Sequence, residues 1–359
     1  MATIAMGCFA AVIALGSLTA CTQKTDAEYK AEIAAAMHTS ITGYLADLVL
    51  AVRTLQISAP DHAWDPVADD PAITRMRDAW KDARVAWENV EGAISDMFEG
   101  LDESMDGRYE QLLGSPKGDQ NLFDDTGVVG MHAIERILYA PFIRPEVKVY
   151  ERTLGGYLEA SFPRTDDEAI SFKTLLVQRL VDDAVELQSS WRPEDVDIAT
   201  AYKGLVGLMA EQKKKIDDAA DGSEESRYSN VTLLDMRNNL IGTGNVYDLF
   251  REWIRSKASS ETADQLIVDK LDKLHKTYQT LRTDALPTVP DGWHSDSPSA
   301  DALNTPYGAL WLQVHATSDP QLDSSVVHDM NVIATLLGFA KFTGIEPPEH
   351  VHSRVGWRR

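Results

Sequence analysis

Apolar residues recur at intervals of three and four along most of the chain, and alternating runs typical of strands are few. This periodicity predicts an all-α fold. Asp197 and Ser229 stand where two predicted helices begin, and their side chains are suited to accept hydrogen bonds from the free backbone amides there. The expected helices cover residues 27–57, 71–98, 127–139, 166–190, 197–219, 229–256, 263–281, 300–317 and 323–343.

The chain is long for a single domain, so we expect two helical-bundle halves. A proline and several polar residues cluster near residues 161–167, where we place the boundary. Tyr139 follows His132 in the first half and Tyr247 follows Asn239 in the second, a faint similarity that favours a distant internal duplication. The predicted organisation is a signal segment at 1–20, a first bundle at 21–160, a second bundle at 161–346 and a polar tail at 347–359.

The first twenty residues carry no charged side chain and are mostly apolar, which is typical of a signal peptide. They end in Leu-Thr-Ala before Cys21, a run that resembles a bacterial lipobox. The resemblance implies cleavage before Cys21, lipid attachment to that cysteine, and membrane contact through the lipid anchor only. We expect a cell-envelope lipoprotein, and in a Gram-negative cell Thr22 favours the outer membrane, facing the periplasm. A simple signal peptide or a short anchor helix is the alternative.

Charge and cysteine content narrow the range of partners. The formal net charge is −22, and binding nucleic acid requires clustered basic residues, so nucleic acid is excluded as an expected partner. An acidic surface also raises the local concentration of cations. Both cysteines, Cys8 and Cys21, lie near the N-terminus, so we expect no disulfide and no thiolate ligand in the mature domain.

Two ionisable residues interrupt the apolar run around residue 130. His132 and Glu135 are three positions apart, so they share one face of the predicted helix. Val128 and Tyr139 extend that face, which we expect to point into the core. Because buried ionisable groups are costly unless they are paired or bound to metal, the pair predicts a metal site or an acid–base pair.

A second predicted helix carries charges among aromatic residues. Trp80, Arg84, Trp87 and Glu91 step by four, three and four, and Glu88 lies beside this stripe. The two tryptophans are natural inward anchors, so they draw the charged residues inward with them. A structural ion pair of Arg84 with Glu88 or Glu91 explains this helix as well as a functional site does.

Bundle cores often hold metal sites built from carboxylates and histidines on facing helices. We therefore expect His132, Glu135 and Glu91 to meet, with Glu88 or an aspartate from residues 100–125 as a further ligand. The site would bind a divalent or trivalent metal ion; iron, manganese, zinc and calcium are all open, and the histidine favours iron or zinc. Arg84 would hold a carboxylate in place. By contrast, we expect the run Lys213–Lys215 to be a solvated helix face.

The ordered set of motifs resembles one known family. Gly130-x-His132-x-x-Glu135 is similar to the GxHxxE signature of the imelysin-like family. Residues 80–92 resemble its first conserved helix, residues 106–110 resemble the loop that follows, and residues 225–240 resemble its second-half motif. The resemblance implies an exported helical protein of two bundle-like halves, with metal ligands at His132 and Glu135 joined by Glu91 and Glu88. The family includes metallopeptidases and also iron-uptake relatives that bind metal without catalysis.

The motif lacks the second histidine that zinc-protease helices carry. Ala133 and Arg136 stand where H-E-x-x-H needs glutamate and histidine, and Arg136 also breaks the inverse pattern H-x-x-E-H. We therefore assign no catalytic residue. We expect a metal-binding protein that supports iron acquisition, together with an iron-uptake system or an outer-membrane receptor. A metallopeptidase acting on extracytoplasmic proteins is the alternative, followed by acidic-glycan binding or a structural lipoprotein.

Overall fold

The computed structural model describes residues 24–113 and 118–344, which form helices and turns and include no strand. The all-α prediction is therefore confirmed. The longer helices are α1 (Asp26–Ser58), α2 (Asp70–Glu88), α9 (Val177–Ser190), α10 (Ile198–Asp218), α11 (Thr232–Arg255), α12 (Glu261–Thr280), α14 (Pro306–Ser318) and α15 (Val326–Leu337). The shorter helices are α3 (Glu91–Ile94), α4 (Glu99–Asp106), α5 (Tyr109–Leu112), α6 (Gly130–Leu138), α7 (Pro145–Glu151), α8 (Asp166–Ser171) and α13 (Ala300–Leu303).

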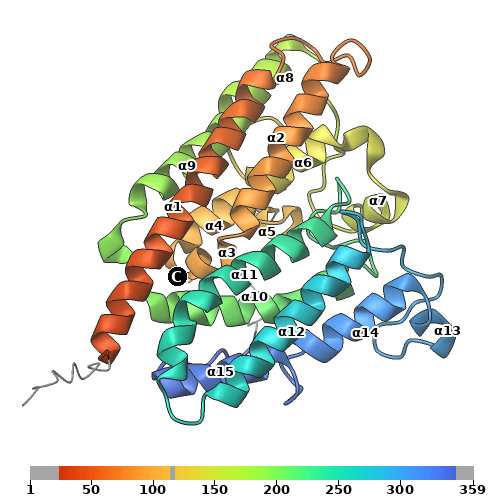
Figure 1. Cartoon of the computed structure of the whole chain (residues 1–359). Coiled ribbons are helices and arrows are strands. Elements are labelled where there is room, and N and C mark those ends of the chain that lie inside the picture. Colours follow the sequence, from red (N-terminus) through yellow and green to blue (C-terminus); the bar gives the residue numbers. More distant parts are fainter. Residues whose placement is uncertain (1–23, 114–117, 345–359) are drawn as a thin grey trace, which may run out of the picture.

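The helices form two packed groups that meet in the middle of the molecule. Helices α1, α2 and α9 lie side by side in the first group, with α4 and α6 against them (Figure 1). Helices α10, α11, α12, α14 and α15 form the second. The groups join where α2 and α3 pack on α10 and α11, and one continuous apolar core runs through both. Helix α9 follows the predicted boundary near residue 161 in the chain, yet it packs on α1 of the first group. The boundary itself stays a prediction.

The long helix α1 shows how apolar spacing places an element in the core. Tyr29, Ile33, Met37, Ile41 and Leu45 recur at every fourth position and are all buried. This stripe packs against α2, α9 and α11, and a Thr25 capping box starts the helix. By length and composition α1 would also be able to cross a membrane, but its buried stripe assigns it to the core of this fold.

The predicted helix over 71–98 is interrupted at residues 89–90, and glycines explain how the break is packed. Gly242 of α11 and Gly204 of α10 face this segment, and a Cβ at either position would lie 2.1–2.2 Å from the carbonyl oxygens of Asn89 and Gly92. A side chain there would clash, so the glycines let α10 and α11 approach the break closely. Gly242 therefore permits close helix packing.

Three short helices lie in regions that the sequence predicts to be loops. Helix α5 and all but the first residue of α4 lie within residues 100–125, and α7 lies within residues 139–149 apart from its last two residues. Helices of four to eight residues offer too few turns for apolar periodicity to emerge. The consequence matters for function, because the loop aspartate expected near the site stands on α4.

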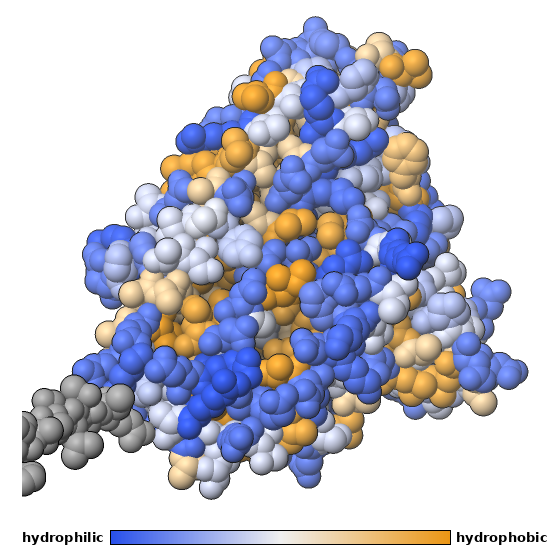
Figure 2. Space-filling model, in the orientation of Figure 1, coloured by the Kyte–Doolittle hydropathy of each residue, from blue (hydrophilic) through white to orange (hydrophobic). Residues whose placement is uncertain are grey.

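The surface is mostly hydrophilic, as the acidic composition predicts. On the face drawn in Figure 2, hydrophobic residues lie in small separate groups among hydrophilic ones. The signal segment 1–20, the lipidation residue Cys21 and the polar tail 347–359 lie outside the described residues.

Candidate metal centre

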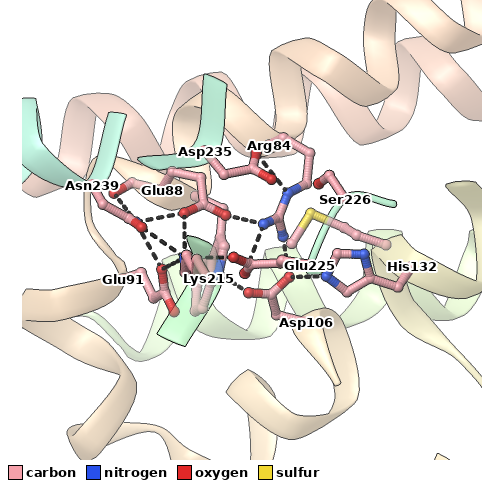
Figure 3. A network of polar contacts seen from close by, with 12 residues as sticks. Arg84, Glu88, Glu91, Asp106, His132, Lys215, Glu225, Ser226, Asp235 and Asn239 are labelled. Carbon is pink, nitrogen blue, oxygen red and sulfur yellow. Dashed lines mark hydrogen bonds and ion pairs between the residues drawn. The ribbon is translucent and has the colours of Figure 1, made fainter. Parts of the chain in front are cut away.

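A cluster of buried charged residues lies where the two helix groups meet. Helices α2, α3, α4, α6, α10 and α11 each contribute a side chain, and the segment 223–231 contributes more (Figure 3). The side chains that surround the cluster are buried or nearly so, which places the charges in the protein interior. We call it the carboxylate cluster and define it as Glu88, Glu91, Asp106, Glu225 and Asp235 with Arg84, Lys215 and His132.

Helix α2 delivers Arg84 to the centre of the cluster. Trp80, Arg84 and Trp87 are fully buried, so the predicted inward stripe is confirmed for these three residues. Trp80 Nε1 donates to the carbonyl oxygen of Met131 at 2.9 Å, and Trp87 Nε1 donates to Asp106 Oδ2 at 2.8 Å. The two tryptophans thus tie α2 to α6 and to α4, the helices that carry His132 and Asp106.

The Arg84 guanidinium contacts four carboxylates. It pairs with Glu88 and Asp106, lies 3.1 Å from Glu225 Oε1, and lies 3.4 Å from Asp235 Oδ1 through Nε. The predicted ion pair with Glu88 is present. Arg84 therefore acts as a buried counter-charge that gathers carboxylates from four elements.

Helix α6 brings His132 and Glu135 onto one inward face, as their spacing predicts. His132 Nδ1 lies 2.9 Å from Glu135 Oε2, and His132 Nε2 lies 3.3 Å from Asp106 Oδ1 without hydrogen-bond geometry. When one ring nitrogen of a histidine is held by a carboxylate, the other is oriented to bind a metal. The Nε2 atom of His132 is thus buried, oriented and unpartnered by any hydrogen bond among the described residues.

The backbone conformation at the start of α6 explains why the GxHxxE motif begins with glycine. Gly130 begins α6 with φ at +83°, a left-handed conformation that favours glycine. A Cβ there would lie 2.5 Å from the carbonyl oxygens of Ser104 and Met105. Gly130 thus lets the first turn of α6 contact α4 just before Asp106, which places Asp106 beside His132.

Segment 223–231 closes the cluster and holds Glu135. The backbone amides of Tyr228 and Ser229 donate to Glu135 Oε1 at 3.1 and 2.8 Å, and the Ser229 hydroxyl donates to it at 2.7 Å. Ser229 was expected to cap a helix, but α11 begins at Thr232 and the serine binds Glu135 instead. Both oxygens of Glu135 therefore have protein partners, and its direct role as a ligand stays a prediction.

Lys215 corrects the expectation of a solvated lysine run on α10. Its side chain is 2% exposed, and its ammonium lies 2.6 Å from Glu225 Oε2 and 2.7 Å from Asn239 Oδ1. Asn239 in turn donates to Glu88 and, at 2.9 Å, to Glu91 Oε2. One of the three consecutive lysines is buried, because successive residues of α10 point in different directions.

Carboxyl groups outnumber permanent cations in the cluster. Five carboxylates surround two permanent cations, Arg84 and Lys215. Burial raises the pKa of Glu91 to about 8 and that of Asp235 to about 6, because the neighbouring cations offset only part of the cost of a buried charge. Burial opposes ionisation of His132, but the Asp106 and Glu135 carboxylates beside the ring outweigh it and raise its pKa to about 9.

The donor atoms fit a metal ion. Asp106, His132 and Glu225 each offer a ligand atom, and these atoms lie within 4.8 Å of one another. Two further groups meet the same test, Glu88 with Glu91 and Asp106, and Glu88 with Glu225 and Asp235. Only the first group includes a nitrogen donor. A metal there would bind His132 Nε2, which forms no hydrogen bond and lies 3.3 Å from Asp106 Oδ1.

Comparison with known proteins identifies the family. The sequence profile of the peptidase M75 family, described as Imelysin, matches residues 24–309. The chain belongs to the imelysin family. Its fold is similar to the crystal structure of an imelysin-like protein from Psychrobacter arcticum 273-4, with a TM-score of 0.55 and 12% identity over 88% of this chain and 98% of that one.

Curated relatives carry the name Efem/EfeO family lipoprotein. The protein from Staphylococcus haemolyticus is 25% identical over 213 residues, 59% of this chain and 61% of the relative. The protein from Staphylococcus aureus strain MSSA476 is 28% identical over 131 residues, 36% of this chain and 45% of the relative. The match therefore spans about three-fifths of the first relative's length and less than half of the second's.

Within this imelysin-family fold, His132, Glu88 and Glu91 belong to one charged cluster, but Glu88 and Glu91 face Lys215 and Asn239, so their joint role as metal ligands stays a prediction. Three cluster residues escaped prediction as members of the site: Lys215, Glu225 and Asp235. Glu225 and Asp235 lie in the stretch 225–240 that resembles the family's second-half motif, so a signal existed. No sequence signal pointed to Lys215, because nothing in its sequence context distinguishes it from its exposed neighbour Lys214.

Proposed function

We propose that this imelysin-family protein is a lipid-anchored, metal-binding protein of the cell envelope that supports iron acquisition. The carrying observation is the buried Nε2 atom of His132, which forms no hydrogen bond, lies 3.3 Å from Asp106 Oδ1 and belongs to one group of ligand atoms with Asp106 and Glu225. An imidazole nitrogen with two or more carboxylate oxygens suits iron or zinc.

Each cluster residue has a distinct role in this proposal. His132, Asp106 and Glu225 are the inner ligands, and Glu135 holds the His132 ring from the other side. Arg84 keeps the carboxylates together. The predicted ligands Glu88 and Glu91 lie further along the cluster, where they meet Lys215 and Asn239 instead of His132. They contribute to the negative field that attracts the cation.

Burial favours an ion over a polypeptide as the ligand. His132 is 1% exposed and Glu88 is fully buried. A peptide bond would reach His132 only after large opening of the helix packing, whereas a metal ion needs a narrow path. The family's peptidase label therefore has less support from this geometry than metal binding has.

The anchor and the iron link complete the proposal. Relatives named as lipoproteins support lipid attachment at Cys21, which would hold the domain at a membrane surface. Helix α1 begins five residues after that cysteine, so the domain would stand close to the membrane. We further propose that an iron-uptake system or an outer-membrane receptor is the partner, and that the two bundle halves arose by duplication.

Equilibrium dialysis of the full chain against Zn²⁺ and Fe³⁺-citrate tests the metal site. We expect one tightly bound ion in the wild type and at least a roughly hundredfold loss of affinity in His132→Ala, which removes the nitrogen ligand. His275→Ala is the matched control, because the half-buried His275 lies on α12 and hydrogen-bonds Gln279 outside the cluster. Equal affinity in wild type and His132→Ala would refute the metal site.

A further inference from the structure

The Lys215 ammonium occupies a cage built from oxygen atoms. It lies 2.6 Å from Glu225 Oε2, 2.7 Å from Asn239 Oδ1, 3.5 Å from Glu88 Oε2 and 4.0 Å from Glu91 Oε2. The four oxygens come from α2, α3, α11 and the segment 223–231, so the cage is formed only in the folded protein. Figure 3 shows the ammonium at the meeting point of these side chains.

Such a cage has the chemistry of a metal site. Three carboxylates and one amide oxygen are ligands that Mn²⁺, Ca²⁺ and Mg²⁺ prefer. A lysine ammonium is a compact point charge with three donors, so it fills the same position with a single positive charge. One ammonium thus faces three carboxyl groups in this cage.

Glu225 connects this cage to the histidine site. Its Oε2 atom contacts Lys215, and Glu225 also offers a ligand atom to the group with Asp106 and His132. Two cation positions therefore lie on either side of one carboxylate. Centres that bind two metal ions use this arrangement, in which acidic side chains lie between neighbouring ions.

We propose that Lys215 fills the second cation position of a two-cation centre and so limits the protein to one metal ion. That ion binds at His132, Asp106 and Glu225, and the inference rests on the proposed function in this respect. Replacing the ammonium by a neutral side chain leaves Glu88, Glu91 and Glu225 free to bind a second ion. Lys215 is thus a residue that determines metal stoichiometry.

Mn²⁺ binding to the full chain tests the inference, because Mn²⁺ accepts carboxylate oxygen and imidazole nitrogen and is visible by electron paramagnetic resonance. Equilibrium dialysis counts the ions in the wild type, His132→Ala, Lys215→Met and the double variant. We expect one bound ion in the wild type, none in His132→Ala, two in Lys215→Met and one in the double variant. In Lys215→Met the resonance spectrum should show coupling between two neighbouring ions. Lys214→Met is the matched control, because the half-exposed Lys214 pairs with Asp218 at the surface, and it should bind one ion.

The possible results separate this inference from the proposed function. One ion in both wild type and Lys215→Met, or two ions in the wild type, would overturn the role of Lys215 and leave the histidine site standing. A third result is that the wild type binds no ion, whereas Lys215→Met binds one ion and the double variant also binds one. This result would support the cage and overturn the histidine site. No ion in either protein would overturn both.

Loss of a buried charge can also impair folding, so two further variants accompany the test. Lys215→Arg keeps the charge and should keep one ion. Lys215→Gln removes the charge with a polar side chain and should bind two ions, as Lys215→Met does. If both neutral variants stay unfolded by circular dichroism even with saturating Mn²⁺, a metal ion does not replace the ammonium and the inference is wrong.

Discussion

Arg84 and Arg136 are both fully buried and both bind carboxylates, but their surroundings differ in charge. Arg136 Nε donates to Glu151 at 2.7 Å, the Tyr228 hydroxyl donates to the same carboxylate at 2.7 Å, and the guanidinium stacks 4.1 Å from the Tyr109 ring. One cation meets one carboxylate, and both groups are fully hydrogen-bonded. We call this set the Arg136 network.

The carboxylate cluster differs from the Arg136 network in holding more carboxyl groups than permanent cations. Its five carboxylates exceed its two permanent cations, and His132 Nε2 lacks a hydrogen bond. Buried polar groups without partners are rare in proteins and call for an explanation. The balanced network explains how the fold is held together, and the unbalanced cluster indicates where a cation belongs.

Breaking the balanced pair should have the largest effect. Glu151→Ala leaves the Arg136 guanidinium buried without its carboxylate, so we expect the free energy of unfolding to fall by about 3–5 kcal/mol. Urea denaturation followed by circular dichroism measures this change. Added Zn²⁺ should not restore the loss, and the exposed Glu159→Ala serves as control with a change within about 0.5 kcal/mol. If metal restored the stability of Glu151→Ala, the Arg136 network would also respond to metal. The contrast between the two networks would then be wrong.

Variants that weaken the hydrogen bonds holding the His132 ring should weaken metal binding by an intermediate amount. Glu135→Gln keeps the shape of the side chain but removes the charge that orients His132 Nδ1, so metal affinity should fall about 10- to 100-fold. Ser229→Ala removes one hydroxyl donor to Glu135 and should cost about tenfold or less. Isothermal titration with Zn²⁺ compares both variants with the wild type. If Glu135→Gln abolished binding as fully as His132→Ala, Glu135 would be a direct ligand, as the sequence predicts.

The pH dependence of stability should show the smallest effect. The pKa of His132 is raised from 6.5 to about 9 and that of Glu91 from 4.5 to about 8, so the metal-free folded protein binds more protons than the unfolded chain. Its free energy of unfolding should therefore fall as pH rises from 6.5 to 9.

Metal should reverse this trend, because a metal ion replaces protons on its ligands and binds more tightly as pH rises. Chemical denaturation at several pH values, with and without Zn²⁺, measures both curves. In His132→Ala the fall with pH should be smaller, because one of the two titrating groups is gone. A metal-free stability that rises between pH 6.5 and 9 would contradict the charge assignment.

The sequence predicts the long helices well, and for a physical reason. The limits of α1, α10 and α12 lie within two residues of the expected ones, because long amphipathic runs repeat over many turns. The break at residues 89–90 could not be predicted, because glycines of α10 and α11, more than a hundred residues away in the chain, determine how it packs.

The candidate site was predictable only in part. The inward faces of His132 and Arg84 follow from helical spacing, and the structure brings these residues together through Asp106. Lys215 required knowledge of how α10 is rotated against α3 and α11, which apolar periodicity does not give. Ser229 looked like a helix cap because serine suits that position, but a buried carboxylate competes for the same hydroxyl.

The most direct test of the central claim is a crystal structure of the protein grown or soaked with Zn²⁺, read by anomalous scattering at the zinc edge. The account predicts one strong peak about 2.0–2.2 Å from His132 Nε2 and from carboxylate oxygens of Asp106 and Glu225. No peak should appear within the Arg136 network. A fully occupied peak elsewhere, or an empty carboxylate cluster in saturating Zn²⁺ with the His132 ring bonded only to protein, would contradict it.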